Sequence, residues 1–534
     1  LIMTYFPDLR RLPDFITIET ESECASFSGG YDIPLHDVLV HMEQTTDCMK
    51  VYLSAQSTPV QRIRMRWNAV LPAETRFCAD AWERGYGDFE WRGFVPERVM
   101  PWYFYAYTQN IFAGFGVRVR PDAMCFFCCD PAGITLTHDV LCGGTGVILN
   151  GRQLICAEIV CAEYCGISPF YAACSFTELL CSDGVFPKAP VYGANNWYYA
   201  YGKSSQEEIL SDAAYLARLT DGLKNRPYLV IDDGWQKLRS EHSDQYIGWP
   251  WRSGNERFPD MAALASKIAA FDILPGIWFR PLQNRDTAIP PKCRLSFDPD
   301  CLDPSVPETL AWIAQDVKTL IGWGYRLIKH DFSTFDLLRF WGSAMQSSIT
   351  NRPDSAFFDR SKTTAIIIKD LYRTIYESAE NKAIILGCNC VGHLGAGYMQ
   401  MNRTGDDVSG LNWERTRRMG VNTLAFRMPQ HNRFYFVDAD CCGITHSVDW
   451  EKNQQWLSLL ANSGTPLFVS VKPGTLVPQQ EELLKSALAR ASILQDAAVP
   501  LDWLDTTCPA NWLIGGQHVA YNWFDQTGIQ NLLI

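Results

Sequence analysis

The sequence predicts a multidomain α/β protein in which a central (β/α)8 TIM barrel follows an N-terminal β-sandwich and precedes a small C-terminal β-sheet domain. Three observations lead to this prediction. The chain has 534 residues, which is too long for one ordinary domain. Its first part consists of short strand-like segments, and its middle part alternates between strand-like and helix-like segments. The predicted domains are residues 1–187, 188–493 and 494–534. We treat the last as a domain that could be incomplete in the given sequence.

Strand and turn patterns define the N-terminal domain. Residues 114–120 and 147–154 alternate between apolar and polar positions, and the second segment contains the turn-forming pair Asn150-Gly151. Several short strands with such turns are typical of a β-sandwich. At the other end of the chain, residues 512–516 have the pattern of a hairpin, which predicts the C-terminal sheet.

Eight strands are predicted in the middle of the chain, with helices between them. The strands are 190–197, 227–232, 273–279, 325–331, 383–388, 398–403, 433–438 and 464–470. The helices include 206–223, 259–271, 308–322, 361–380 and 448–462, and a further helix is expected near 480–492. Eight strands in about 280 residues match the count and length of a (β/α)8 barrel. A doubly wound sheet is the structural alternative.

Composition excludes several partner classes. The formal net charge of −12 argues against nucleic acid or an anionic membrane as the main partner, and no apolar run reaches membrane-spanning length. The chain is rich in aromatic residues, with 18 Trp, 22 Tyr and 28 Phe. Part of this excess belongs to the core, but Trp is also a common platform for the C–H face of a sugar.

The 19 cysteines do not have the spacing of a disulfide framework. Cys125, Cys128 and Cys129 form a CxxCC run, and Cys441 and Cys442 are adjacent, but neither group has a second CxxC or a His pair nearby. We therefore expect buried, reduced thiols and no metal. Reduced thiols, and a start that lacks a signal-peptide pattern, predict a cytoplasmic protein whose N-terminus could be trimmed in the given sequence.

Polar and aromatic residues cluster at the C-terminal ends of the predicted barrel strands, where a barrel has its active site. They are Trp197, Asp232, Asp233, Trp278, Arg280, Lys329, Asp331, Asn389, Cys390, Arg403, Asp406, Asp407, Asp438 and Asp440. A single Asp at a strand end is more often a helix cap than a catalyst. Because several strands carry such residues, the pattern favours an enzyme, and one that acts on sugars.

The carboxylates suit glycoside hydrolysis. A retaining glycosidase needs two carboxyl groups about 5–5.5 Å apart, one as nucleophile and one as acid/base. Lys329 lies two positions before Asp331, so it faces the same side of an extended strand and can keep Asp331 ionised. The acid/base must hold a proton, which favours a position among other carboxylates such as the Asp406-Asp407 pair.

The pair Asp232-Asp233 suits recognition of a sugar. Adjacent carboxylates can accept hydrogen bonds from two hydroxyls, while Trp235 or Trp197 covers an apolar face. Binding of Mg²⁺ or Ca²⁺ is the alternative for this carboxylate set, but alternating Asp ligands within one loop are absent from the sequence.

Four segments resemble, in order and spacing, the clan D glycoside hydrolases, which are the α-galactosidases and α-N-acetylgalactosaminidases of families 27 and 36. The segments are Ile-Asp-Asp-Gly-Trp-Gln at 231–236, Lys-His-Asp at 329–331, Arg-Thr-Gly-Asp-Asp at 403–407 and Val-Asp-Ala-Asp at 437–440. Asn-Asn-Trp-Tyr at 195–198 is similar to the Trp segment of the family's first strand. The order of the predicted domains looks like family 36, and the resemblance covers nearly the whole chain.

The resemblance implies a role for each catalytic residue. Asp331 would be the nucleophile that attacks the anomeric carbon, and Lys329 would bind sugar hydroxyls. Asp232 and Asp233 would bind the 4- and 6-hydroxyls and so recognise galactose. The acid in relatives often lies four residues after the Arg that corresponds to Arg403, which selects Asp407, with Asp406 as the rival. The substrate contacts expected on these grounds are Asp232, Asp233, Lys329, Trp197, Trp235, Trp278, Arg280, Ser333, Asn389, Cys390, Arg403 and Asp440.

The chain also departs from the family pattern. Asp331 is followed by Phe332 and Ser333 where family 36 commonly has Met-Asn, and 390–395 replaces the Cys-x-Ser-Gly-Gly-Gly loop. These segments shape the space around the 2- and 3-positions of the sugar, so galactose and N-acetylgalactosamine both stay open. Arg280 stands where many relatives have an acidic residue, and it could meet an acidic or extended substrate or pair with a neighbouring Asp.

These observations together predict a retaining exo-α-galactosidase that needs no cofactor and acts on an α-galactoside oligosaccharide or glycoconjugate. The alternatives are an α-N-acetylgalactosaminidase, a transglycosylase of the raffinose-synthase type and a non-catalytic sugar-binding protein. The sequence leaves the oligomeric state open.

Overall fold

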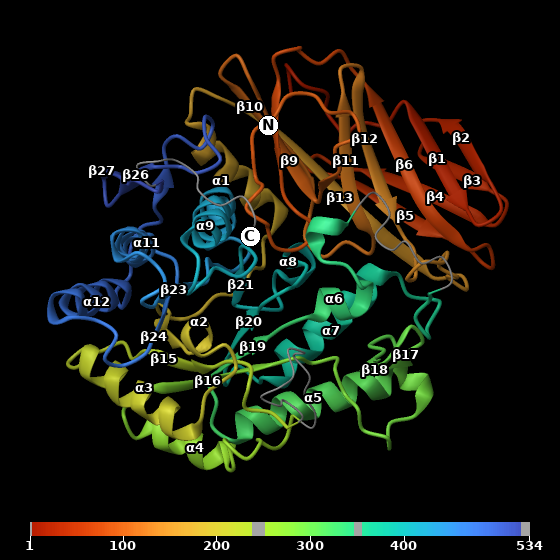
Figure 1. Ribbon diagram of the computed structural model, residues 1–534. Coiled ribbons are helices and arrows are strands. Elements are labelled where there is room, and N and C mark those ends of the chain that lie inside the picture. The colour runs from red at the N-terminus through yellow and green to blue at the C-terminus, as the bar shows by residue number, and fades with distance from the viewer. Residues whose placement is uncertain (1–2, 238–250, 346–354, 525–534) are drawn as a thin grey trace.

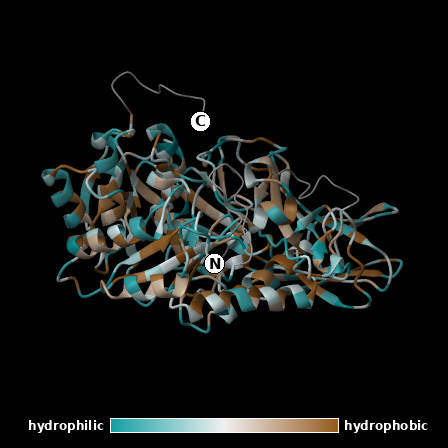
Figure 2. Cartoon of the chain, turned by 60° about the horizontal axis from the view of Figure 1, so that its bottom comes forward, coloured by the Kyte–Doolittle hydropathy of each residue, from teal (hydrophilic) through white to brown (hydrophobic). Residues whose placement is uncertain are grey.

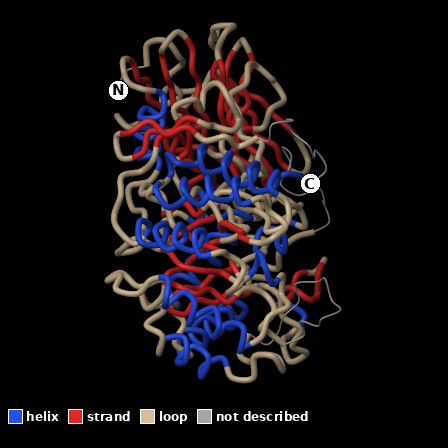
Figure 3. Tube along the Cα trace, turned by 60° about the vertical axis from the view of Figure 1, so that its left-hand side comes forward, coloured by secondary structure: helices blue, strands red, loops and turns tan. Residues whose placement is uncertain are grey.

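The computed structural model describes residues 3–237, 251–345 and 355–524 (Figure 1). Antiparallel sheets built from the N-terminal third of the chain form one end of the molecule. A curled parallel sheet wrapped by helices forms the other end (Figures 1 and 3). A three-stranded sheet near the C-terminus lies beside the helices α11 (Trp450–Asn462) and α12 (Pro478–Ala491). The molecule is therefore a multidomain α/β protein.

Two antiparallel sheets make up the N-terminal part. The first has the order β2 (Cys24–Ser28), β1 (Phe15–Thr20), β6 (Val60–Asn68), β12 (Gly133–Asp139), β11 (Met124–Asp130), β8 (Met100–Pro101). The second has the order β3 (Asp32–Leu35), β4 (Val38–Gln44), β5 (Met49–Ser54), β13 (Gln153–Cys165), β10 (Ile111–Val117), β9 (Tyr103–Thr108), β7 (Arg76–Ala79). The rings of Phe104 and Phe127, one from each sheet, lie 5.2 Å apart, so the two sheets share a core.

Helix α1 (Pro169–Leu180) closes one side of the second sheet and begins with proline in its first turn. It packs on β10, where Gly114 leaves room for the ring of Phe176; a Cβ atom at this glycine would lie 2.2 Å from that ring. The absence of a side chain within the strand therefore allows the helix to approach the sheet closely.

The central sheet has nine parallel strands and includes all eight predicted ones. Its order is β22 (Phe436–Asp438), β21 (Met401–Arg403), β20 (Ile384–Gly387), β19 (Leu327–His330), β16 (Leu274–Phe279), β15 (Tyr228–Ile231), β14 (Tyr192–Asn195), β24 (Leu467–Val471), β23 (Cys441–Ile444). Most of these strands are buried on both faces, which explains why strands such as β15, β16 and β24 are short, largely apolar runs.

The two outermost strands of this sheet are consecutive in the sequence. Only Ala439 and Asp440 separate β22 from β23, and Asp440 has a φ of +71°. β22 pairs with β21, whereas β23 pairs with β24 at the other end of the strand order. The sheet therefore curls until its two edges meet in one segment of the chain.

Helices connect the strands and cover the outside of the curled sheet (Figure 1). The longer ones besides α11 and α12 are α3 (Gln206–Leu219), α4 (Met261–Ala269), α5 (Pro307–Gly322) and α7 (Thr364–Ser378). Shorter ones are α2 (Trp197–Ala200), α6 (Ser333–Leu338), α8 (Gly392–Gly395), α9 (Trp413–Thr416) and α10 (Thr423–Arg427). A two-stranded ribbon, β17 (Arg294–Leu295) and β18 (Asp298–Leu302), lies before α5.

Helix α4 illustrates how these helices dock. Met261, Leu264, Ala265 and Ile268 are buried at helical spacing, and apolar and polar positions alternate along such helices in Figure 2. The helix was expected to include Pro259, but it starts at Met261 because the Asp260 side chain accepts a hydrogen bond from the Ala263 backbone N–H and caps it.

The C-terminal sheet contains the predicted hairpin. β25 (Val499–Pro500), β26 (Asn511–Ile514) and β27 (Gln517–Ala520) are antiparallel. The turn between β26 and β27 is Gly515-Gly516, and both glycines have positive φ, +55° and +79°. Such a turn fits glycine because an L side chain would be strained there.

Several classes of feature are absent from the described part of the chain. No helix in residues 3–237, 251–345 or 355–524 has both the length and the apolar character needed to cross a bilayer. No group of three or more His, Cys, Asp or Glu side chains in these ranges is arranged to hold a metal ion. All 19 cysteines are free, and all except Cys24, Cys128 and Cys165 are buried.

Candidate active site

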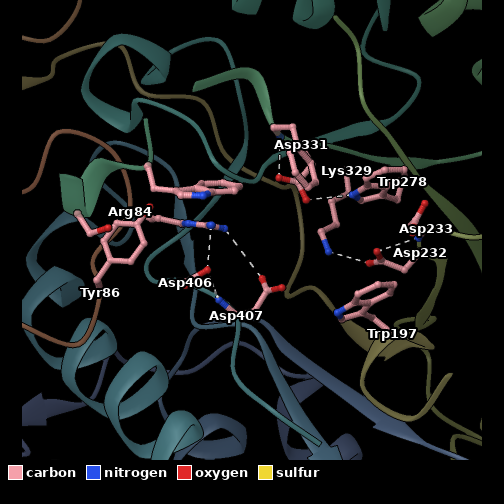
Figure 4. Close-up of a pocket in the computed structure, with 13 residues that line it drawn as sticks. Arg84, Tyr86, Trp197, Asp232, Asp233, Trp278, Lys329, Asp331, Asp406 and Asp407 are labelled. Atoms are coloured by element: carbon pink, nitrogen blue, oxygen red, sulfur yellow. Dashed lines mark hydrogen bonds and ion pairs between the residues drawn. The ribbon is translucent and has the colours of Figure 1, made fainter. Parts of the chain in front are cut away.

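A pocket of about 360 Å³ opens at the C-terminal ends of the central strands (Figure 4). It is lined by Arg84, Tyr86, Trp197, Asp232, Asp233, Trp278, Lys329, Asp331, Phe332, Trp341, Ser343, Asp406 and Asp407. Most of the lining follows directly from strands β14, β15, β19 and β21. The end of the sheet that carries the pocket is therefore the end at which catalytic groups gather in a barrel.

Asp331 is held in a fixed orientation on the upper rim of the pocket in Figure 4. The indole N–H of Trp278 donates to its Oδ2 at 3.0 Å, and the backbone N–H of Phe332 donates to its Oδ1 at 2.7 Å. Phe332 has a φ of +67°, in the sparsely populated left-handed region. This backbone conformation brings the Phe332 amide onto the carboxylate, and the two donors fix its orientation.

Lys329 and Asp232 form a buried ion pair, with 2.7 Å between Nζ and Oδ2. Asn195 donates to the same Oδ2 at 2.6 Å, and the amide of Gln236 donates to Asp233. Burial lowers the pKa of the Lys329 ammonium, but the charges of Asp232 and, more weakly, Asp331 outweigh burial and raise it. The sequence suggested Asp331 as the partner of this lysine, whereas the direct contact is with Asp232.

The two carboxylates of the Asp406-Asp407 pair have different surroundings. Each oxygen of Asp406 forms an ion pair with a different guanidinium group: Oδ1 lies 2.9 Å from Arg84, and Oδ2 lies 2.8 Å from Arg415. Asp407 contacts Arg403 through Oδ1 at 3.1 Å, and no residue in the described ranges donates a hydrogen bond to its other oxygen. The Asp407 side chain is 41% exposed, against 19% for Asp406. This geometry favours Asp407 as the group that meets a ligand.

The charges around Asp407 hold it in the ionised form. Burial raises its pKa, but the positive charges of Arg403, Arg84 and Lys329 outweigh burial and lower the pKa to about 2. Arg403 is itself fixed by Asp440, whose Oδ2 lies 2.7 Å from the guanidinium. Asp440 also accepts a hydrogen bond from the Val408 backbone N–H at 3.0 Å, and so secures the segment that carries Asp407.

Part of the pocket wall comes from the N-terminal part of the chain, which the sequence did not predict. Arg84 and Tyr86 belong to a loop after β7 that pairs with the loop of Asp406. The Gly85 N–H donates to the Thr404 carbonyl at 2.8 Å, and the Asp406 N–H donates to the Gly85 carbonyl at 2.9 Å. Trp341 and Ser343 complete this wall from the segment after α6. The aromatic and glycine-rich run at 82–87 is the only sequence signal for such a loop.

Two expected contacts do not lie on the pocket. Trp235 is fully buried, its indole N–H donates to the Trp278 carbonyl at 2.9 Å, and its ring packs near Trp251, so it supports Trp278 instead of covering a sugar. Arg280 pairs with Asp336 at 2.5 Å and lies 4.4 Å from the Phe332 ring. The option that this arginine pairs with a neighbouring Asp therefore agrees with the structure, and its role is to support Phe332.

The segment that replaces the glycine-rich loop also lies behind the pocket. Ser333, Asn389 and Cys390 are buried and do not contribute to the lining. Asn389 donates to buried Glu83 at 2.5 Å, and the Cys390 thiol lies 3.6 Å from Nδ1 of His330. The structure therefore places these three residues behind the lining, where their side chains pack the ends of β19 and β20.

Arg403 and Asp440 likewise stand behind the lining, where they position Asp407. The structure thus brings Trp197, Asp232, Asp233, Trp278, Lys329, Asp331, Asp406 and Asp407 together, as the sequence predicted. The remaining predicted residues, Trp235 included, form a layer of support around that set.

No model of a protein family matches this sequence, and neither does any curated protein. Solved structures do match. The α-galactosidase TtGalA from Thermus thermophilus, in complex with p-nitrophenyl α-D-galactopyranoside, has a TM-score of 0.61 and 17% identity over 92% of this chain and 99% of that chain. The GH36 α-galactosidase AgaA from Geobacillus stearothermophilus has a TM-score of 0.57 and 13% identity over 94% of this chain and 79% of that chain.

The galactosidase domain of the α-galactosidase-sucrose kinase AgaSK matches with a TM-score of 0.54 and 12% identity over 85% of this chain and 66% of that chain. These similarities extend over both the N-terminal sheets and the central sheet, and their TM-scores of 0.54–0.61 show a common fold at identities of only 12–17%. The chain therefore has the clan D fold of the α-galactosidases of glycoside hydrolase family 36.

Proposed function

We propose that this protein is a retaining, exo-acting α-galactosidase. One observation carries the proposal: a single pocket contains Asp331 fixed by two donors, a partly exposed Asp407, and the buried Lys329-Asp232 pair. These are the nucleophile, the acid/base and the recognition groups that a double-displacement glycosidase requires. The shared fold with known α-galactosidases supports the same conclusion.

In the first step, an Asp331 oxygen attacks the anomeric carbon while the bond from that carbon to the leaving oxygen breaks. Asp407 in its protonated form, which the surrounding cations disfavour, delivers its proton to the leaving oxygen, so the aglycone departs as a neutral alcohol. The product is a β-linked glycosyl ester on Asp331. The Trp278 and Phe332 donors hold the attacking carboxylate in place before the step, which reduces the entropy cost of reaching the transition state.

In the second step, Asp407, now ionised, removes a proton from a water molecule, and the water oxygen attacks the anomeric carbon. The ester bond to Asp331 breaks, α-galactose leaves and Asp407 regains its proton. Two inversions give net retention. The positive charges around Asp407 favour its ionised form and therefore suit this step.

The remaining lining gives specificity for galactose. Asp232, Asp233 and Lys329 lie together on the side of Figure 4 opposite Arg84, where they can bind the hydroxyls of one terminal sugar. Trp197 lies beside them and offers an aromatic surface to the apolar C–H face of the ring. A pocket of about 360 Å³ suits one sugar ring, which supports exo action.

The same proposal includes the finer architecture. We take the curled sheet to be a (β/α)8 barrel in which β22 and β23 are halves of one interrupted strand, within a barrel domain at 188–493. The N-terminal sheets would form a β-sandwich domain at 1–187, and 494–534 would form the C-terminal domain. The partner would be an α-galactoside oligosaccharide or glycoconjugate in the cytoplasm; structures of TtGalA contain such a substrate, stachyose.

Turnover of 4-nitrophenyl α-galactoside, α-N-acetylgalactosaminide and α-glucoside by the wild type tests the activity and the sugar. We expect the first to be cleaved, with α-galactose as the first anomer seen by ¹H NMR. Asp331→Ala should abolish turnover while the fold, followed by circular dichroism, stays intact. Near-normal turnover in that variant, or β-galactose as the first product, would contradict the proposal.

The same substrates separate the alternatives. Preference for the N-acetylgalactosaminide would identify an α-N-acetylgalactosaminidase, and galactosyl transfer to added sugar acceptors in excess of hydrolysis would identify a transglycosylase. Binding of galactose without turnover of any α-galactoside would identify a non-catalytic sugar-binding protein.

A further inference from the structure

Arg84 is an unusual member of the pocket because it comes from the N-terminal part of the chain and lies beside the acidic pair. It is almost fully buried, with 7% of its side chain exposed. Its guanidinium lies 5.1 Å from the Trp341 ring and 5.7 Å from the Tyr86 ring. Both contacts are cation–π interactions, and together they restrict where the guanidinium can lie.

A buried carboxylate behind Arg84 reinforces this placement. Glu83 is fully buried; it accepts hydrogen bonds from the Gly342 N–H at 2.8 Å and from the Tyr86 hydroxyl, and its Oε1 lies 3.9 Å from Nε of Arg84. Glu83 thus ties together Tyr86 and the segment of Trp341, the two rings that contact the guanidinium. The rings and the charge of Arg84 form one rigid unit.

This unit directs the guanidinium toward the acidic pair. One terminal nitrogen of Arg84 lies 2.9 Å from Oδ1 of Asp406, and the other lies 4.0 Å from Oδ1 of Asp407. Arg84 is therefore anchored by Asp406 and acts on Asp407 at a distance where the interaction of opposite charges is strong in a partly buried site. Figure 4 shows the two contacts as dashed lines from one guanidinium.

We propose that Arg84 is a positioning residue that sets the pH range in which Asp407 carries its proton, and so the pH range of the acid step. The proposal rests on the proposed function, in which Asp407 is the acid/base. It assigns to the N-terminal part of the chain a direct influence on the chemistry, through an arginine that touches the acid/base side of the pocket.

Other charged and titratable groups also surround Asp407. They are Arg403, Lys329, Asp331, Asp406 and Asp440, with the phenols of Tyr198 and Tyr201 nearby. Arg403 is neutralised in part by Asp440, and Lys329 by Asp232. Arg84 shares its charge with Asp406, which Arg415 also neutralises. Arg403 lies closest to Asp407, at 3.1 Å, and Arg84, at 4.0 Å, is the cation that the N-terminal part of the chain supplies.

The test compares Arg84→Gln, Arg84→Lys and Arg415→Gln with the wild type. Arg415→Gln is the matched control, because it removes the other arginine on Asp406 and leaves the approach to Asp407 intact. The titration midpoint of Asp407 is followed by carboxyl ¹³C NMR, with Asp407→Asn to assign the resonance. Activity is followed as kcat/KM against pH on methyl α-galactoside, which needs acid assistance, and on 2,4-dinitrophenyl α-galactoside, which needs little.

We expect the Asp407 midpoint to rise by about one pH unit in Arg84→Gln, since a nearby opposite charge shifts a carboxyl pKa by that order. For methyl α-galactoside, the alkaline limb of the kcat/KM profile should shift to higher pH by the same amount as the Asp407 midpoint. For the dinitrophenyl substrate, the limb should stay in place. Arg84→Lys should show a smaller shift, because it keeps the charge. If Arg84 had only a structural role, its replacement would lower kcat/KM for both substrates without shifting the alkaline limb.

An unchanged midpoint in Arg84→Gln, or an equal shift in Arg415→Gln, would overturn the proposal. The NMR midpoint does not depend on turnover, so it decides the influence of Arg84 even if the wild type cleaves no galactoside. In that case the proposed function fails separately. If Arg84→Gln does not fold, Arg84→Met replaces it in the same comparison, because it also removes the charge.

Discussion

The Lys329 ammonium and the Asp232 carboxylate lie 2.7 Å apart on the floor of the pocket, with 9% and 5% of their side chains exposed. They come from neighbouring regions of the curled sheet, at the ends of β19 and β15. Each charge depends on the other, because neither can be solvated at this depth. In the proposed function, the pair therefore links sugar recognition to the stability of the sheet.

Lys329→Met should reduce the free energy of unfolding by about 3–5 kcal/mol, since it leaves Asp232 buried without its cation. Unfolding in urea measures the loss. The double variant Lys329→Met/Asp232→Asn is the control, and it should be less destabilised than Lys329→Met alone. If the double variant is the less stable of the two, the pair does not contribute in this way.

Trp278→Phe should lower kcat by roughly tenfold or more, because a hydrogen bond to a charged carboxylate contributes about 1.5–3 kcal/mol. The substitution keeps an aromatic ring but removes the donor to Asp331 Oδ2. Trp251→Phe serves as the control, since its indole N–H donates to the Gln283 carbonyl and the residue belongs to the same aromatic cluster. Equal losses in the two variants would mean that packing, and not the hydrogen bond, is responsible.

Replacement of the two adjacent aspartates should distinguish the acid/base from the anchor. In Asp407→Ala, turnover of an alkyl galactoside should fall by about 10²–10⁴-fold, the usual contribution of acid–base catalysis. Added azide should restore turnover of an aryl galactoside by attacking the glycosyl ester. The product should be α-galactosyl azide, because the ester on Asp331 is β-linked and the attack inverts it. Rescue in Asp406→Ala instead would exchange the two assignments.

Much of the fold follows from local sequence patterns. Strands such as β15 and β24 are short, largely apolar runs because they are buried on both faces, and each is followed by a helical pattern, so eight of the nine central strands could be predicted. Asp232 and Asp331 could be predicted as site residues for the same reason, since a residue that follows a parallel strand must lie at the carboxyl end of the sheet.

The parts that were not predicted depend on tertiary structure. Arg84 and Tyr86 reach the pocket only because their loop pairs with the loop of Asp406, and no local pattern encodes that contact. Trp235 was expected on the pocket because it follows Asp232-Asp233 closely. Gly234, with a φ of +123°, turns the chain there, and the indole points into the aromatic core.

Asp212 allows a test of electrostatics away from the pocket. It lies on α3, only 7% exposed, and its carboxylate accepts a hydrogen bond from the Tyr199 hydroxyl. Burial raises its pKa to about 7, whereas the unfolded chain should titrate near about 3.9. Between these values the folded protein binds the extra proton, so the stability that this group contributes declines as the pH rises from about 4 to 7.

Asp212→Asn removes this titration and keeps an oxygen that can accept the Tyr199 hydroxyl. We expect the variant to be more stable than the wild type above pH 7, by between about 1 and 4 kcal/mol, and the difference to shrink as the pH falls toward 4. Urea unfolding across this range measures it, with the exposed Asp221→Asn as control. A stability difference that does not change with pH would show that Asp212 is ionised in the folded protein throughout.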